Sequence, residues 1–361
     1  MKRTPLFDTH KKLKGKLVEF GGWEMPLFYS GVVAEHKAVR EHVGLFDICH
    51  MGRLGVKGKD AEAFLQGVTV NNIAALAPGK AQYSLVCNPQ GGVKDDIFIY
   101  KKGRGDYFLC VNASNREKIT LWFLDQKGKY EVDIQDISDR VGMLALQGPK
   151  APRVLEKILG KKFKSLKHAE FFEEEIAGAL TMIARTGYTG ERGYEFYFPI
   201  TYVEKLWNLL FEASQEEQGV PVGLGARDTL RLEMGYALYG HELTEEISPL
   251  EADLARFVYF DKENFIGKEV LTAQHKKGVS RSLVGFELKI KNVPRQHCKV
   301  FYGDREIGEV TSGNLTPSVQ TGIGMALVQS NFQKPGSDIF IGIRDKKIPA
   351  IITKKCFYRK K

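Results

Sequence analysis

The feature of this sequence best suited to chemistry is a pair of adjacent carboxylates, Asp95 and Asp96, in the stretch GGVKDDIFIY at residues 91–100. The apolar run that follows predicts a β-strand, in which alternate side chains point to opposite faces. Asp95 then shares a face with Val93 and Ile97, whereas Asp96 faces the other way. The carboxylates therefore diverge, which disfavours a joint metal site and a carboxylate dyad. A strand end with both carboxylates hydrated remains the alternative interpretation.

A second candidate site is the glycine-rich stretch RTGYTGERGYEFYF at residues 185–198. Gly187, Gly190 and Gly193 recur every three residues, but no Gly-Lys-Ser/Thr follows, so a phosphate-binding loop is not supported. The glycines are expected to permit tight turns and close approach of a ligand to the backbone. Glu195 is flanked by aromatic residues in a predicted strand. Its two oxygens suit a flat heterocycle with an amino group and an adjacent ring N–H, although an ordinary hairpin with an outward glutamate is the alternative.

A third candidate is a predicted helix in GLGARDTLRLEMGYALYGHEL, residues 223–243. Its apolar stripe consists of Leu230, Met234, Ala237 and Leu238. Arg227 lies near the helix start, where the macrodipole disfavours a cation by ~0.3–1 kcal/mol. An arginine in such a place suits an anionic ligand, because guanidinium can bind a carboxylate through two hydrogen bonds. Arg231 lies one turn further on the same side, and its pairing with Asp228 is the alternative.

The histidines are weaker candidates for functional residues. His36 and His42 lie on a predicted helix over residues 30–44, SGVVAEHKAVREHVG, which a serine can cap and a glycine can end. We expect both to be solvated helix residues. His50, in CHMG, has no other histidine or acid at ligand spacing, so we expect a structural role.

Predicted strands and helices position these residues. Antiparallel strands are expected at 81–88, 93–100 and 106–113, with a turn at 89–92, and helices at 150–159 and 201–217. From about residue 279 onward, short apolar runs separated by Gly, Asn and Asp predict a small all-β domain. The predicted class is α+β with a separate C-terminal β domain.

Composition further limits the class of protein, its location and its partners. With 361 residues, 43% hydrophobic and 27% charged, the chain has ordinary globular composition, and no apolar run is long enough for a membrane span. The N-terminus has no apolar segment of a secretory signal. Five widely spaced cysteines without a C-x-x-C pair predict reduced thiols and a cytoplasmic location. The net charge of +9 favours an anionic partner, but no motif indicates nucleic acid.

Taken together, these stretches resemble the glycine cleavage system T-protein, or aminomethyltransferase, family. The likeness runs from Pro5 to the C-terminal FYRK, and it rests on the combination of the DD strand, the GYTG…E hairpin and the GARD helix. The stretches that follow the family pattern are, in order, TPLFDTH, EFGGWEMPLFYSG, GLFDICHMG, GGVKDDIFIY, ALQGPKA, RTGYTGERGYEFY, PVGLGARDTLRLEMGYALYG and GEVTSGN.

The resemblance implies an activity and an architecture. Members of the family bind tetrahydrofolate in a central channel between three domains and act on an aminomethyl group carried on the lipoyl arm of the H-protein. The products are ammonia, 5,10-methylenetetrahydrofolate and dihydrolipoyl H-protein, and no metal is needed. The implied domains are a first α+β domain (1–52 with 141–245), a second that carries the catalytic strand (53–140 with 246–275), and a C-terminal barrel or jelly-roll-like β domain (276–361).

The resemblance also assigns residues. The second Asp of the pair is the family's catalytic carboxylate, which corresponds to Asp96. Glu195 corresponds to the glutamate that holds the pterin, Tyr188 to the aromatic residue beside it, and Arg227 to the arginine for the glutamate tail of folate. Three further residues correspond to positions lining the folate channel: Tyr83, Asn112 and Tyr236.

Two residues depart from the family pattern, and two alternatives remain open. Arg256 stands where Trp is common and Cys49 where Ser is usual, which bears on folate affinity and tail preference. One alternative is another tetrahydrofolate-dependent one-carbon transferase or demethylase of the same superfamily, although no flavin-binding G-x-G-x-x-G unit is attached. The other is a non-catalytic folate-binding protein, although the Lys-Gly-Cys motif typical of such relatives is not found where it is expected.

Overall fold

The computed structural model describes residues 1–359, and the last two residues of the C-terminal basic run lie outside the described part. The chain divides into two compact units. Unit 1 consists of Met1–Leu65, Ile73–Tyr83 and Ile97–Asp228, and unit 2 consists of Gln66–Asn72, Ser84–Asp96 and the chain from Thr229 onward. Within the described chain, no helix is long and apolar enough to cross a membrane.

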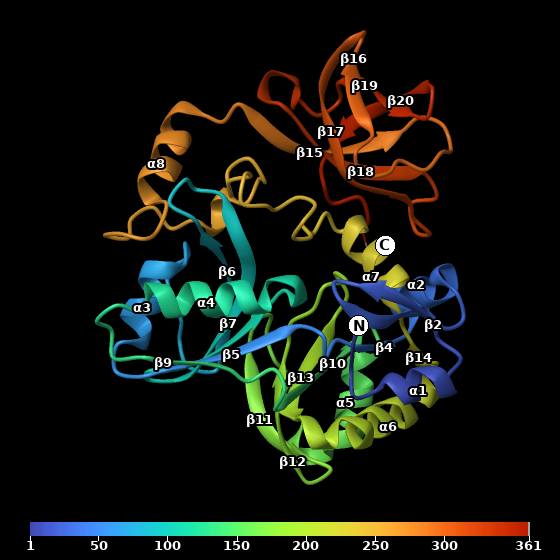
Figure 1. Cartoon of the computed structure of the whole chain (residues 1–361). Coiled ribbons are helices and arrows are strands. Elements are labelled where there is room, and N and C mark those ends of the chain that lie inside the picture. The colour runs from blue at the N-terminus through green and yellow to red at the C-terminus, as the bar shows by residue number, and fades with distance from the viewer. Residues whose placement is uncertain (360–361) are drawn as a thin grey trace. The chain divides into compact units, whose positions relative to one another are not determined.

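Unit 1 contains two sheets, and the larger of them joins strands that lie far apart in the sequence (Figure 1). The larger has the order β11-β12-β13-β10-β4-β14, and the smaller has the order β1-β3-β2. The strands of the larger sheet are β4 (Gly44–Asp47), β10 (Val141–Gln147), β11 (Phe171–Ile176), β12 (Ala179–Ala184), β13 (Gly193–Pro199) and β14 (Val220–Pro221). Those of the smaller are β1 (Lys2–Arg3), β2 (Lys16–Phe20) and β3 (Trp23–Phe28), with α1 (Phe7–Lys12) between the first two in the chain.

Helices α5 (Ala151–Leu159) and α6 (Val203–Ser214) bury their apolar faces in the core that also contains β10 and β13. Helix α5 has a proline in its first turn and is followed by Gly160 with φ 52°, which are ordinary start and stop signals. Leu155 and Trp207 are almost completely buried in the same cluster as Phe196. Both helices confirm the sequence prediction, because their apolar residues recur at a spacing that only a helix places on one face.

The third sheet has the order β6-β7-β8-β5-β9 and carries the acidic pair. Its strands are β5 (Gly52–Lys57), β6 (Lys80–Cys87), β7 (Val93–Gly103), β8 (Asp106–Val111) and β9 (Asp133–Asp136), and α3 (Ala61–Val68) and α4 (Arg116–Gln126) lie between strands in the chain. Strands β7 and β8 are antiparallel, with Phe98 opposite Cys110. The three predicted strands are therefore all present.

Unit 2 contains helix α8 (Lys268–Lys277) and a closed six-stranded barrel of order β15-β18-β17-β16-β19-β20. The barrel strands are β15 (Arg281–Leu288), β16 (Lys299–Tyr302), β17 (Arg305–Leu315), β18 (Gly322–Gln329), β19 (Asp338–Ile343) and β20 (Lys346–Thr353). Alternating residues such as Val284, Phe286 and Leu288 fill its interior. Mixed α/β structure followed by an all-β barrel confirms the predicted α+β class.

Helix α2 (Val32–Glu41) corrects two expectations. The helix begins after Gly31, and its start is held by the carboxylate of Glu35 rather than by a serine cap. Oε1 of Glu35 accepts hydrogen bonds from the backbone N–H groups of Tyr29 (2.5 Å), Ser30 (2.9 Å) and Gly31 (3.2 Å). His36, next to Glu35 on the inward side, is completely buried, so the expectation of a solvated His36 was wrong.

Helix α7 (Leu224–Glu233) is shorter than the apolar stripe suggested. Gly235 has φ 66°, and the Tyr236 N–H donates to the carbonyl of Arg231 at 3.0 Å, which is the closing bond of a Schellman motif. Ala237 and Leu238, predicted to continue the helix, therefore lie in the following loop. A Cβ at position 235 would lie 2.3 Å from the carbonyl oxygen of Lys355, so the glycine is also required sterically.

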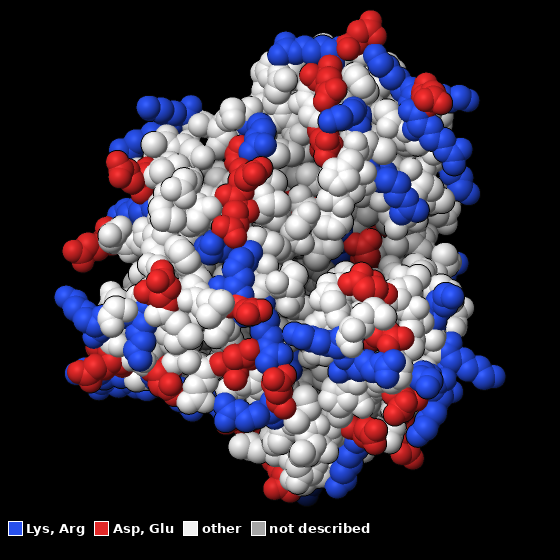
Figure 2. Space-filling view, in the orientation of Figure 1, with Lys and Arg blue, Asp and Glu red and all other residues white. Residues whose placement is uncertain are grey.

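Charged side chains of both signs are interspersed on the face of the molecule drawn in Figure 2, where Lys and Arg lie among Asp and Glu. Lys162 pairs with Glu174 at 2.8 Å in unit 1, and Lys347 pairs with Asp304 at 2.7 Å in unit 2. On this face the excess of basic residues does not gather in one patch.

Candidate functional site

The two acids at the start of β7 differ in burial, as the strand period predicts. Asp95 is 0% exposed and shares the inward face with Val93 and Ile97, whereas Asp96 is only partly buried. The turn before the strand is closed by a hydrogen bond from Asn88 N–H to the carbonyl of Gly92 at 2.9 Å. A strand end with both acids hydrated is therefore wrong for Asp95, while Asp96 retains the partial exposure that a reacting group needs.

Glu195 lies on β13 with its carboxylate enclosed by hydroxyl groups, and it is 8% exposed. Its Oε2 accepts hydrogen bonds from Thr186 (2.5 Å), Tyr197 (3.2 Å) and Tyr100 (3.4 Å). Burial, and then the charge of Glu195, raises the pKa of both tyrosines well above its ordinary value. Glu195 is thus a buried acid held by neutral donors, and the alternative of an outward glutamate was wrong.

The glycines beside Glu195 make room for a protein side chain. A Cβ at Gly187 or Gly193 would lie 2.1 or 2.5 Å from side-chain atoms of Gln147. Gln147 donates to the carbonyl of Thr186 (3.2 Å) and accepts from the hydroxyl of Thr189 (2.9 Å). The backbone approach that we expected for a ligand is therefore made at these two positions by Gln147. Its role was not visible in the sequence, because it comes from β10, about 40 residues earlier in the chain.

Arg227 and Tyr188 form the second part of the candidate site in unit 1. The guanidinium carbon of Arg227 lies 4.8 Å from the centroid of the Tyr188 ring, and both residues are partly exposed. Among the described residues of its own unit, no carboxylate lies within ion-pair distance of Arg227. The ring orients the cation without neutralising it, which leaves its hydrogen-bond donors for an anion.

His50 is 2% exposed, in the loop between β4 and β5, and its ring packs edgewise on Phe20 with a centroid distance of 5.9 Å. Burial, followed by the positive charge of Arg227, lowers the pKa of His50 from 6.5 to about 3. Within residues 1–359, Nδ1 of this ring has no hydrogen-bond partner. The expected structural role agrees with the burial but does not account for the unpartnered nitrogen.

Arg231 pairs with Glu242, a partner that sequence reasoning missed. Nη1 of Arg231 lies 3.1 Å from Oε2 of Glu242, and both side chains are almost fully buried. The same guanidinium donates to the carbonyl of Tyr236 (3.1 Å) and to Oγ of Ser312 (2.9 Å). These contacts of Arg231 join α7 to the loop that follows it and to β17 within unit 2.

Three other predicted positions are Tyr83, Asn112 and Tyr236. Tyr83, on β6, is partly buried and packs edge-to-face on Phe98 at 5.6 Å. Asn112 directly follows β8 and is partly buried, and Tyr236 follows the end of α7 with 36% of its surface exposed. Within unit 1 the structure brings Tyr188 and Arg227 together. Asp96 and Tyr236 belong to unit 2.

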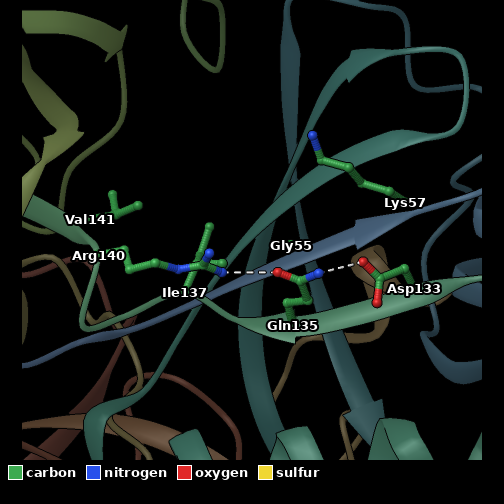
Figure 3. Close-up of a pocket in the computed structure, with 7 residues that line it drawn as sticks. All are labelled: Gly55, Lys57, Asp133, Gln135, Ile137, Arg140 and Val141. Carbon is green, nitrogen blue, oxygen red and sulfur yellow. Dashed lines mark hydrogen bonds between the residues drawn. The ribbon is translucent and has the colours of Figure 1, made fainter.

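Among the described residues there is no group of three or more His, Cys, Asp or Glu side chains that could hold a metal ion. A hollow of about 440 Å³ lies beside β5 and β9 in unit 1, and Figure 3 shows its lining residues Gly55, Lys57, Asp133, Gln135, Ile137, Arg140 and Val141. Arg140 donates to Gln135 (2.9 Å), which donates to Asp133 (2.6 Å). None of the predicted site residues lines this hollow.

The fold defines a class: a mixed α/β protein with a C-terminal six-stranded β-barrel. Comparison with models of known protein families then identifies the family within this class. Residues 6–262 match the model described as the GCVT N-terminal domain, and residues 281–359 match the glycine cleavage T-protein C-terminal barrel domain. The chain therefore belongs to the glycine cleavage T-protein family.

Full-length relatives agree with this assignment. The aminomethyltransferase of Thermoanaerobacter sp. (strain X514) is 45% identical over 100% of this chain and 98% of its own length. That of Alkaliphilus oremlandii is also 45% identical, over 99% of this chain and 98% of its own. The crystal structure of glycine cleavage system aminomethyltransferase T from Bartonella henselae superimposes with a TM-score of 0.93, covering 99% of this chain and 98% of that one at 32% identity.

Proposed function

We propose that this chain is the aminomethyltransferase of a glycine cleavage system. It transfers the methylene group of aminomethyl-lipoyl H-protein to tetrahydrofolate and releases ammonia, giving 5,10-methylenetetrahydrofolate and dihydrolipoyl H-protein. The observation that carries the proposal is the full-length match to aminomethyltransferases at 45% identity, in a fold that superimposes on that of the T-protein. Tetrahydrofolate is a co-substrate in this reaction, and the H-protein is the partner.

The residues of unit 1 support folate as the ligand. Glu195 is buried, and its Oε2 accepts hydrogen bonds from three hydroxyl groups; a carboxylate fixed in this way suits the donor pair of an aminopyrimidine edge. Arg227, stacked on Tyr188, offers a guanidinium fork for the carboxylates of the glutamate tail. We assign Tyr83, Asn112 and Tyr236 to further contacts with the same ligand.

Asp96 is assigned the chemical step. Loss of ammonia from a methylene bound to sulfur and nitrogen passes through cationic, iminium-like species. A single partly buried carboxylate stabilises that charge, and it orients or deprotonates the attacking folate nitrogen. The new C–N bonds to folate replace the C–S and C–NH₂ bonds, so that the sulfur leaves as the lipoyl thiol. Asp96 suits this role because it is partly exposed, whereas Asp95 is enclosed.

We also propose a cellular location, a division into domains and a local contact for Arg256. We place the enzyme in the cytoplasm, which the five free cysteines support. The three-domain division at residues 1–52 with 141–245, 53–140 with 246–275, and 276–361 stays a prediction, and limited proteolysis with mass-spectrometric mapping would test it. Arg256, in the place of the family's Trp, is exposed with its guanidinium 4.8 Å from the ring of Phe257, so it stacks locally.

The test is a reconstituted transfer assay. Purified protein, tetrahydrofolate and aminomethylated lipoyl H-protein should yield ammonia and methylenetetrahydrofolate in equal amounts. Folate binding without turnover would contradict the proposal and favour a non-catalytic folate-binding protein. Turnover with a free methylated amine but not with the carrier would favour another one-carbon transferase or demethylase.

A further inference from the structure

A loop that follows α7 is anchored to the start of β7, and both segments belong to unit 2. The backbone N–H of Val93 donates to the carbonyls of Thr244 (2.9 Å) and Ile247 (3.0 Å). A Cβ at Gly92 would overlap the carbonyl oxygen of Glu245, so the glycine permits this close approach of the two backbones. The fold therefore fixes Glu245 beside the strand that carries the acidic pair.

The side chain of Glu245 pairs with Lys94, the second residue of β7. Oε2 of Glu245 lies 2.9 Å from Nζ of Lys94, whose side chain is only 12% exposed. Because alternate residues of a strand point to one face, Lys94 and Asp96 lie on the same side of β7, and both are partly buried. Two residues of a strand span roughly 6.7 Å, which the four-carbon stem of a lysine can bridge. Glu245 therefore holds a cation that lies within reach of the proposed catalytic carboxylate.

The phenol of Tyr239 lies in the same electrostatic region. Tyr239 is partly buried and forms an isolated β-bridge with Leu243, just before the anchored part of the loop. Burial, followed by the negative charges of Glu245, Asp95 and Asp96, raises the pKa of this phenol above its ordinary value. The carboxylate of Glu245 and the acidic pair thus act on one neighbouring group, which agrees with the direct contact between Glu245 and β7.

We propose that Glu245 is a positioning residue for the transfer reaction: it binds the ammonium of Lys94 and balances its charge, so that the charge of Asp96 remains available to the reacting methylene. This inference rests on the proposed function, in which Asp96 stabilises cationic, iminium-like species. An ammonium paired with Asp96 would weaken that carboxylate as a base and screen its negative charge. A second acid that binds the ammonium preserves both properties of Asp96.

A double-mutant cycle on the full-length protein tests the proposal. Single-turnover rates of methylenetetrahydrofolate formation and dissociation constants of tetrahydrofolate are measured for wild type, Glu245→Gln, Lys94→Met and the variant with both changes. We expect Glu245→Gln to slow transfer about threefold to tenfold without changing the dissociation constant, because the released ammonium then acts on Asp96. Lys94→Met should transfer at least as fast as wild type, and its addition to Glu245→Gln should restore the rate.

A neighbouring acid provides the matched control. Glu246→Gln, at the next exposed glutamate of the loop, removes the same charge and should leave the transfer rate unchanged. The Tm of Glu245→Gln should stay near that of wild type, because the side chain of Glu245 is 41% exposed and such ion pairs contribute little to stability. A double variant as slow as Glu245→Gln would overturn the inference, since removal of the second partner does not restore a purely structural contact. A wild-type rate in Glu245→Gln, or a slow Lys94→Met variant, would also overturn it.

A failure of the proposed function gives a different result. Wild-type protein that forms no methylenetetrahydrofolate would contradict the proposed function and the inference together. Transfer by wild type at the same rate as by Glu245→Gln would contradict the inference alone. The Asp96→Asn background shows whether Glu245 acts through Asp96: there, Glu245→Gln should add little further loss of rate, and an undiminished threefold to tenfold loss would contradict the inference.

Discussion

Two regions of this protein treat buried charge in opposite ways. In unit 2, the guanidinium of Arg231 and the carboxylate of Glu242 lie 3.1 Å apart and balance each other's charge inside the fold. In unit 1, Glu195 is held by three hydroxyl groups and Arg227 by an aromatic ring, so neither charge is neutralised within that unit. A paired charge contributes to structure, whereas an oriented but unpaired charge is available to a ligand. Arg227 and Arg231 are one helical turn apart in sequence, so residue type alone does not distinguish the two cases.

The largest effect is expected from breaking the paired region. Glu242→Ala leaves the guanidinium of Arg231 buried without its acid, and we expect a loss of about 3–5 kcal/mol in the free energy of unfolding. Chemical denaturation measures this change. The double variant Arg231→Met/Glu242→Leu removes both charges and should recover a large part of the loss. Equal destabilisation by the single and double variants would show that packing, rather than the ion pair, matters at this position.

The same kind of change in the unpaired region should affect binding instead. Arg227→Ala removes a charge-assisted contact worth about 1.5–3 kcal/mol, so tetrahydrofolate should bind roughly 10–100-fold more weakly while the unfolding free energy stays almost unchanged. Titration calorimetry and denaturation give the two values. Arg192→Ala, at an exposed arginine of the same unit, is the control and should change neither. A destabilisation like that of Glu242→Ala would remove the distinction between the regions.

Glu195→Gln sharpens the comparison by removing charge with little change in shape. One accepting oxygen becomes a donor that cannot pair with the donors of an aminopyrimidine, so folate affinity should fall at least about tenfold. Stability should be preserved or slightly increased, because a buried carboxylate becomes neutral. Binding of tetrahydropterin without the tail should fall by the same factor, which distinguishes this position from Arg227. Loss confined to the tailed ligand would place the pterin elsewhere.

The smallest effect concerns the pH dependence of stability. The pKa of His50 is lowered from 6.5 to about 3 in the folded chain, by burial first and then by Arg227. As the pH falls below 6.5 the unfolded chain takes up a proton at this site and the folded chain does not, so the free energy of unfolding falls by up to about 1.4 kcal/mol per pH unit. His50→Gln should show a shallower decline between about pH 6.5 and pH 5 in denaturation curves. An unchanged slope would mean that His50 is not the titrating group.

Local periodicity accounts for what the sequence predicted well. The alternation in β7 places Asp95 inside and Asp96 partly outside because a strand repeats every two residues, and the barrel follows from short apolar runs separated by turn residues. The end of α7 was missed because the apolar spacing continues past Gly235, where a positive φ stops the helix.

Contacts between residues far apart in the sequence account for the features of the site that the sequence did not predict. Tyr100 reaches Glu195 from 95 residues earlier in the chain, and Gln147 takes the space beside Gly187 and Gly193. Glu242 is only 11 residues from Arg231, but the helix end between them has to be known before the pair can be foreseen. The family resemblance selected Asp96 within the acidic pair, a choice that strand geometry alone did not make.

Asp96 is the group proposed to promote transfer, and single-turnover measurement of methylenetetrahydrofolate formation tests this assignment most directly. Asp96→Asn should slow transfer by about 10²–10⁴-fold with tetrahydrofolate affinity nearly unchanged, as expected for loss of a general base or charge-stabilising carboxylate. Asp95→Asn should slow transfer less than about tenfold and mainly lower Tm, because Asp95 is enclosed. If Asp95→Asn abolishes transfer while Asp96→Asn retains it, the assignment within the pair is contradicted.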